Sequence, residues 1–210
     1  MHRIDSRTKA LGLARRLLWP LLLAATLLLA ACHRDDGLTW RLTNISGHMP
    51  DLAFQLTDDN GRAVTAADYR GKVVLLYFGY THCPDVCPLT LAQLHAVLER
   101  VGPTADDARI LFVSVDPARD TPAIMHAYVN AFDKRAVGLT GTPRATEALS
   151  KRYRSAFTRE PDQSAGQYEV SHSSAIYLFD RQGRARLLAT PAATQDDLVH
   201  DIHLLLGTGK

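Results

Sequence analysis

The sequence predicts an α/β domain in which a mixed β-sheet is flanked by helices and carries an N-terminal β-hairpin extension. An unbroken apolar run at residues 73–78 and a mostly apolar run at 109–115 are typical of strands that are buried on both faces of a sheet. A segment with helical periodicity follows each run. Near the C-terminus, residues 174–179 and 186–189 form two short apolar segments around a turn, which indicates an antiparallel pair.

The composition excludes some classes of function. The chain has 210 residues, 46% of them hydrophobic, which suits one globular domain plus a leader. Its net charge of +2 arises in residues 1–31, which hold five of the 24 basic residues and one of the 22 acidic ones. The remainder has a net charge of about −2, and aromatic residues make up only 7% of the chain. We therefore expect no nucleic acid partner.

The first 31 residues resemble a bacterial lipoprotein signal peptide. A basic start is followed by an apolar run over residues 17–31, which is shorter than the roughly 20 residues of a spanning helix. Small residues then precede Cys32, so we expect cleavage before Cys32 and lipidation of its thiol. The alternative is an uncleaved signal anchor in which this cysteine is incidental.

The leader also sets the expected organisation and location. We expect a signal peptide over residues 1–31, a polar tether over 32–48 and one domain over 49–210. The domain would be a membrane-anchored lipoprotein on the periplasmic side of a bacterial cell envelope.

The elements before the central strand are short. Residues 52–56 alternate between apolar and polar side chains, and Asn60-Gly61 after them is a strong hairpin signal. Residues 66–72 connect this hairpin to the strand at residues 73–78, which ends at Gly79.

Helices and strands then alternate along the chain. A helix is expected from residue 89 to Val101, with Leu91, Leu94 and Leu98 on its apolar face and Gly102 at its end. The expected elements that follow are a strand at 109–115, a helix from 120 to about 132, a helix at 143–157, a loop or irregular hairpin at 158–171, the two C-terminal strands and a helix at 194–206. This order, hairpin-β-α-β-α-α-β-β-α, is a thioredoxin-like arrangement.

Two cysteines, Cys83 and Cys87, stand at the first strand-to-helix junction with three residues between them. A disulfide across so short a loop stabilises a fold little, so a reactive pair is the better interpretation. The N-terminus of a helix favours the thiolate, and we expect lowered thiol pKa values there. A spacing of four puts both sulfurs on one side of a helical turn, where they can share a soft metal ion or close into a disulfide.

A third metal ligand is expected from the loop before the strand at 174–179. His172 stands there, and a thioredoxin-like fold would bring this loop beside the cysteines. His82 adjoins Cys83 too closely to share one metal ion with it, so we interpret His82 as a second-shell residue. Two thiolates and one imidazole suit copper, as Cu(I), Cu(II) or both, and leave an open coordination position.

Three separated segments, residues 79–88, 113–122 and 170–180, closely resemble the Sco (SenC) family, and the match spans roughly residues 48–206. The resemblance implies a thioredoxin-like fold with copper bound by Cys83, Cys87 and His172. It also implies delivery of copper to the CuA centre of cytochrome c oxidase subunit II, or reduction of that centre's cysteines.

Two aspartates near these motifs have more than one interpretation. Asp116 matches an acidic position of the family near the site, where it would support the metal from the second shell, but it could equally cap the following helix. Asp85 is expected to cap the helix that carries the second cysteine, and contact with a partner is the alternative.

Three functions remain open at this point. The first is a copper metallochaperone. The second is a thiol–disulfide oxidoreductase that uses Cys83 and Cys87, although such enzymes usually have two residues between their cysteines and have no need of His172. The third is a copper- or redox-sensing module. We expect no enzyme activity beyond a possible thiol–disulfide reductase.

The expected partners follow from the same chemistry. They are oxidase subunit II, a copper donor, a thiol reductant and, through the lipid, the membrane. The reductant is expected because an oxidised Cys83–Cys87 pair cannot hold metal.

Overall fold

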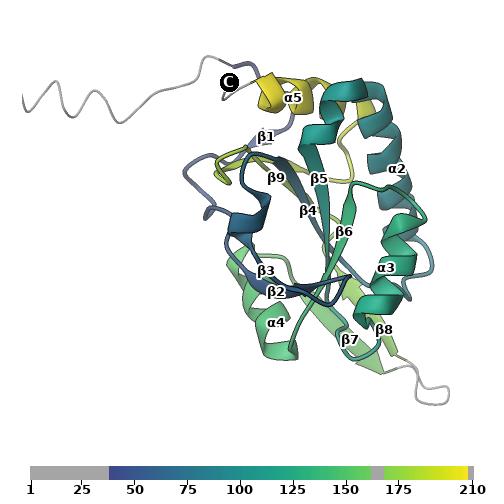
Figure 1. Ribbon diagram of the computed structural model, residues 1–210. Coiled ribbons are helices and arrows are strands. Elements are labelled where there is room, and N and C mark those ends of the chain that lie inside the picture. Colours follow the sequence, from purple (N-terminus) through teal and green to yellow (C-terminus); the bar gives the residue numbers. More distant parts are fainter. Residues whose placement is uncertain (1–37, 162–167, 208–210) are drawn as a thin grey trace, which may run out of the picture. The chain divides into compact units, whose positions relative to one another are not determined.

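Figure 1 shows the computed structural model, which describes residues 38–161 and 168–207. The chain divides into two compact units, residues 1–39 and 40–210, and the second unit holds all of the described helices and strands. The predicted signal peptide and the predicted lipidation site, Cys32, lie outside the described residues. No helix in the described part has the length and apolar character needed to cross a bilayer.

The main sheet has eight strands in the order β1-β10-β9-β4-β5-β6-β2-β3. Strands β4, β5 and β6 are parallel to one another, and the other neighbours in the sheet are antiparallel. The strands are β1 (Thr43–Asn44), β2 (Gln55–Asp58), β3 (Ala63–Thr65), β4 (Val73–Gly79), β5 (Ala108–Ser114), β6 (Ala136–Thr140), β9 (Ile176–Phe179) and β10 (Ala185–Ala189). A separate antiparallel hairpin consists of β7 (Phe157–Pro161) and β8 (Tyr168–His172).

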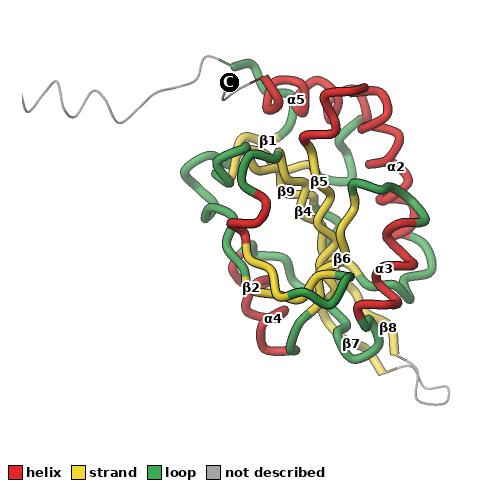
Figure 2. Tube along the Cα trace, viewed as in Figure 1, coloured by secondary structure: helices red, strands yellow, loops and turns green. Residues whose placement is uncertain are grey.

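Helices cover both faces of the sheet. The α-helices are α2 (Val86–Val101), α3 (Pro122–Asn130), α4 (Pro143–Arg152) and α5 (Gln195–Gly207), and two 3₁₀ helices are η1 (Ala66–Tyr69) and η2 (Gly102–Asp107). Helices α2 and α3 lie on one face and α4 lies on the other (Figure 1). Helix α5 packs against α2. The tube in Figure 2 shows the same layers, with red helices around the yellow strands. The predicted thioredoxin-like α/β fold with an N-terminal hairpin is confirmed.

The core is built around β4, which lies between β9 and β5. All seven residues of β4 are buried, because helices and sheet neighbours cover both of its faces. The predicted inner face of α2 is confirmed, since Leu91, Leu94, Leu98 and Val101 are all buried. Gly102 ends this helix with a φ of +78°, a conformation that glycine adopts without strain.

Two strands of the sheet are missing from the sequence-based prediction, the two-residue β1 and β6. β6 is only five residues long and contains Gly138, so its pattern is weak. The glycine has a packing role, because a Cβ atom at Gly138 would lie 2.8 Å from the Cβ atom of Met125 in α3. Because glycine has no side chain, α3 can lie close against β6 at this position.

The third predicted helix, at residues 143–157, is too long. Helix α4 ends at Arg152, and Arg154 has a φ of +54°, which is incompatible with a continuing helix. Residues 158–171, predicted as a loop or irregular hairpin, contribute to the β7–β8 hairpin, with residues 162–167 outside the described part.

The segment before residue 49, expected as a polar tether, is partly integrated into the domain. Thr43 and Asn44 pair with β10, and Leu42 and Ile45 are buried in the core. Asp201 of α5 is fully buried and holds this segment, because its carboxylate accepts hydrogen bonds from the backbone N–H groups of Arg41 and Leu42 at 2.8–3.1 Å. The compact unit thus begins near Trp40.

Replacing Asp201 with alanine should lower the free energy of unfolding by about 1–3 kcal/mol, because two backbone N–H groups lose their acceptor. Urea denaturation measures this change. The matched control is Asp196→Ala on the same helix, whose carboxylate is 71% exposed and pairs with Arg100. Equal stability of the two variants would contradict the proposed anchoring role.

Candidate metal centre

The end of β4 positions the cysteine pair. Gly79 is the last residue of the strand, and a Cβ atom there would lie 2.8 Å from the Cys87 Sγ atom and 2.5 Å from Cε2 of Phe112. Only glycine fits without displacing these groups. The sulfur of Cys87 therefore packs directly against the backbone where the central strand ends.

Cys87 is the second residue of α2 and is fully buried. The hydroxyl of Tyr77 donates a hydrogen bond to its sulfur at 3.7 Å. Burial raises the pKa of the Cys87 thiol to about 12, and hydrogen bonds from the Tyr80 backbone and from Tyr77 oppose this effect only in part. The expected lowering of the thiol pKa by the helix N-terminus is therefore wrong for Cys87.

Cys83 lies in the turn before the helix and is partly exposed. Its backbone N–H donates a hydrogen bond to the Tyr80 carbonyl at 3.3 Å. The helix begins at Val86 rather than at residue 89, so only the second cysteine is helical. The two free thiols are nevertheless neighbours, and both the charge of Cys83 and its hydrogen bond to Cys87 contribute to the raised pKa of the latter.

Asp85 does not act as the predicted cap. It occupies the N-cap position of α2, but its side chain makes no capping hydrogen bond. Its backbone angles, φ −138° and ψ −69°, differ from the extended conformation that lets a capping side chain reach back to the first turn.

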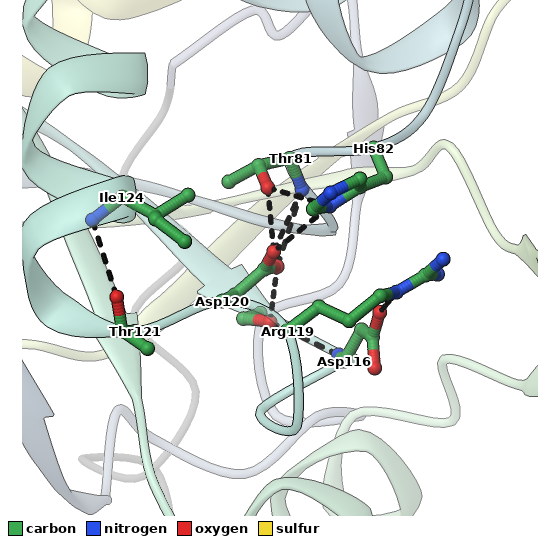
Figure 3. Close-up of polar contacts among 8 residues, drawn as sticks. Thr81, His82, Asp116, Arg119, Asp120, Thr121 and Ile124 are labelled. Carbon is green, nitrogen blue, oxygen red and sulfur yellow. Dashed lines mark hydrogen bonds and ion pairs between the residues drawn. The ribbon is translucent and has the colours of Figure 1, made fainter.

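A buried carboxylate that the sequence analysis did not single out, Asp120, holds the segment before Cys83 in place (Figure 3). It accepts hydrogen bonds at 2.6 Å from the hydroxyls of Thr81 and Ser114, and at 3.1 Å from the Thr81 backbone N–H. Asp120 thus connects the turn after β4 to the end of β5. In the sequence it resembles only the start of a helix, so no local signal identified this role.

His82 lies beside this carboxylate, as Figure 3 shows. Its Nδ1 atom is 3.1 Å from the Thr81 hydroxyl and 3.7 Å from Asp120 Oδ1, and half of its side chain is exposed. These contacts orient the residue that precedes Cys83. The predicted second-shell role of His82 remains a prediction.

Asp116 is fully buried and forms an ion pair with Arg119. It does not cap α3, because Thr121 is the N-cap and its side-chain oxygen accepts a hydrogen bond from the Ile124 N–H at 3.4 Å. The capping interpretation of Asp116 is therefore wrong. Arg119 also lies over the Tyr80 ring, with its Cζ atom 5.8 Å from the ring centroid, so this ion pair borders the chain that leads to Cys83.

The backbone at His172 approaches the same end of the sheet. His172 is the last residue of β8 and stands four positions before Ile176, which pairs with Tyr77 of β4. Because β9 runs antiparallel to β4, the chain enters β9 where β4 ends. The His172 side chain lies outside the described part of the structure, so its role as third ligand remains a prediction.

A second group of potential metal donors, His95, Glu99 and Asp133, lies away from the thiols, and its ligand atoms are within 4.8 Å of one another. Arg135 already binds both carboxylates, at 2.6 Å each. His95 Nδ1 is 2.9 Å from Asp133. This group is therefore a complete ion-pair network, with a guanidinium occupying the place of a cation.

Comparisons with known proteins show which family this chain is similar to. A family model described as SCO1/SenC matches residues 46–207. The protein "Protein SCO2 homolog, mitochondrial" of Bos taurus is 43% identical over 132 residues, which are 62% of this chain and 50% of that protein. The chain thus spans about half the length of this relative.

Two solved structures are similar in both fold and sequence. The copper-bound structure of Bradyrhizobium japonicum ScoI has a TM-score of 0.68 and 40% identity, and the match covers 74% of this chain and 99% of that one. Copper-bound yeast Sco1 has a TM-score of 0.69 and 31% identity, with 77% and 91% covered. With its thioredoxin-like sheet, its adjacent thiols and a family match over most of its length, this chain belongs to the SCO1/SenC family.

Proposed function

We propose that this protein is a copper metallochaperone that binds one copper ion through Cys83, Cys87 and His172 and delivers it to the CuA site of cytochrome c oxidase. One observation carries the proposal: two free, neighbouring thiols lie at the end of the central strand. They do so in a chain that is 40% identical to a ScoI protein crystallised with copper bound.

The donor chemistry supports copper as the cargo. Thiolate sulfur is a soft ligand that selects Cu(I), and an imidazole from His172 would also suit Cu(II). The Cys87 sulfur lies beside the ring of Phe112 and accepts a hydrogen bond from the Tyr77 hydroxyl. By contrast, the His95 group offers mainly carboxylate oxygens that Arg135 already binds.

The burial of the two thiols differs, and this difference suggests an order for loading and release. Cys87 has to lose a proton before its sulfur can bind metal, so loading is coupled to proton release. Cys83 is the more accessible sulfur, so a ligand from the recipient would replace it first. Three protein ligands leave one coordination position through which that ligand can enter.

The recipient and the location are part of the same proposal. The recipient is oxidase subunit II, and a copper donor and a thiol reductant act before it. Lipidation of Cys32 would keep the domain at the periplasmic side of a bacterial membrane. The tether would then be short, because Arg41 and Leu42 are already fixed to Asp201.

Reduction of the CuA cysteines by Cys83 and Cys87 is the second candidate function. The contact between the two thiols favours it, because neighbouring thiols can close into a disulfide. A sensing role would use the same groups without turnover. A dependence on His172 distinguishes these functions, since only copper binding needs the imidazole.

The variant His172→Ala should lose most of its copper affinity and the thiolate-to-copper charge-transfer band, while its thiols still react with a disulfide. Absorption titration of the reduced protein with Cu(I) and Cu(II) measures the affinity, and assembly of the oxidase tests delivery. We expect one equivalent of each ion for the parent protein. His203→Ala is the matched control, because His203 is exposed on α5. Normal oxidase assembly with His172→Ala would refute copper delivery and favour the reductase.

In the metal-free protein, Cys83 should react with iodoacetamide well before Cys87. With a pKa of about 12, Cys87 is a thiolate in only about one molecule in 10⁴ at pH 8, and its sulfur is buried. The alkylation rate of Cys87 should rise about tenfold per pH unit up to about pH 11, because the thiolate is the reactive form. Mass spectrometry of peptides from timed samples measures both rates, and unfolding in urea should make them similar. Equal rates in the folded protein would contradict the assigned burial.

A further inference from the structure

The three large apolar side chains that are exposed among the described residues all lie on the first turns of helices near the cysteine pair. Val86 and Leu89, on α2, are 43% and 64% exposed, and Ile124, on α3, is 41% exposed. We call these three side chains the apolar rim. Single exposed apolar residues are common on protein surfaces, but a group of them at one place marks an interaction site more often.

Two members of the apolar rim lie on the turn of α2 that carries the buried sulfur. Val86 directly precedes Cys87, and a spacing of three places Val86 and Leu89 on the same face of the helix. Cys87 is fully buried while both rim residues are exposed, so the rim lies on the solvent side of this turn. Cys83, the partly exposed sulfur, stands three residues before Val86.

The third member, Ile124, is fixed to the same end of the molecule through Asp120. This aspartate directly precedes Thr121, the N-cap of α3, and its carboxylate accepts a hydrogen bond at 2.6 Å from the hydroxyl of Thr81. Thr81 stands two residues before Cys83. Figure 3 shows Thr121 and Ile124 together with this contact. The first turn of α3 is therefore held next to the turn that carries the exposed sulfur.

The parts of α2 and α3 that carry the apolar rim have no charged side chains. Residues 86–94 of α2 and the whole of α3 contain no lysine, arginine, aspartate or glutamate. The histidine of α3, His126, lies 3.4 Å from Asp59 in the turn between β2 and β3. By contrast, α4 exposes the ion pair of Glu147 and Lys151. The helix surface beside the thiols is thus uncharged, as the centre of a protein–protein interface usually is.

We propose that the apolar rim is the docking surface for the protein that takes copper from this one, and that this partner presents an uncharged, apolar surface around its own copper ligands. The inference rests on the proposed copper-delivery function and adds how the recipient is recognised. A ligand of the recipient has to reach Cys83, beside which the rim lies. Covering apolar atoms at this place is favourable, whereas burying a charge of the partner against them is costly.

The small size of the apolar rim suits a transient contact. Three side chains are too few for the roughly 1,200–2,000 Å² that a stable protein–protein interface buries. A complex that passes on a metal ion also has to dissociate after each delivery. The rim therefore has the extent expected for a brief encounter and not for a permanent subunit contact.

The test measures docking and copper binding separately in Leu89→Gln and Ile124→Gln. Glutamine is polar and uncharged, so these variants change the apolar rim without adding a charge near the sulfurs. The docking probe is the soluble domain of oxidase subunit II with its copper-binding cysteines replaced by serine, so that no copper is transferred. Titration of the copper-loaded protein with this domain should give a Kd about tenfold higher in each variant than in the parent protein.

Two controls separate docking from other effects. The copper affinity of both variants should equal that of the parent protein, because neither side chain offers a ligand. Ala148→Gln is the matched control, since Ala148 is exposed on α4, on the other face of the sheet, and should change neither quantity (Figure 1). Raising the ionic strength from about 0.01 M to about 1 M shortens the Debye length from about 30 Å to about 3 Å, and should change the docking Kd of the parent protein by less than about threefold.

A docking Kd equal to that of the parent protein in both rim variants would overturn this inference and leave copper binding intact. A Kd that rises steeply with salt would also overturn it, because charged contacts would then dominate docking. Unchanged docking together with weaker binding to phosphatidylcholine vesicles, or with weaker self-association in sedimentation, would assign the rim to a membrane or to a second copy of the chain instead. If the parent protein binds no copper, the copper titration alone shows that the proposed function fails.

Discussion

The burial of β4 on both faces is the constraint on which the rest of the structure depends. Neighbouring strands on each side fix its direction and register, so the point where it ends is fixed as well. At that point Gly79 allows the sulfur of Cys87 to touch the backbone, and α2 begins within seven residues. The thiol pair therefore follows directly on the fully buried central strand.

Buried carboxylates provide the second level of organisation. Asp120 connects the turn before Cys83 to β5, and Asp201 fixes the N-terminal segment to α5. Both are fully buried, and both accept several hydrogen bonds, which offset the cost of removing a charge from water. The Tyr128 hydroxyl departs from this rule, since it is buried with no hydrogen-bond partner among the described residues.

Much of the fold could be predicted from the sequence because its main signals are local. The apolar runs of β4 and β5, the turn between β9 and β10, and the inner face of α2 depend on periodicity and turn residues alone. β6 was not predicted because it is short and contains Gly138. This glycine serves the packing of α3 against the sheet, which the local sequence pattern does not show. The raised pKa of Cys87 and the role of Asp120 depend on neighbours distant in sequence, which only the folded chain brings together.

The unequal burial of the two sulfurs also bears on oxidative damage. A peroxide molecule arriving from solvent meets the partly exposed Cys83, whereas Cys87 is enclosed by protein. A sulfenic acid formed at Cys83 lies next to a second thiol, which can condense with it into a disulfide before further oxygen is added. The disulfide is reducible, while sulfinic and sulfonic acids at this position would not be. The same asymmetry thus limits the damage to a reversible product.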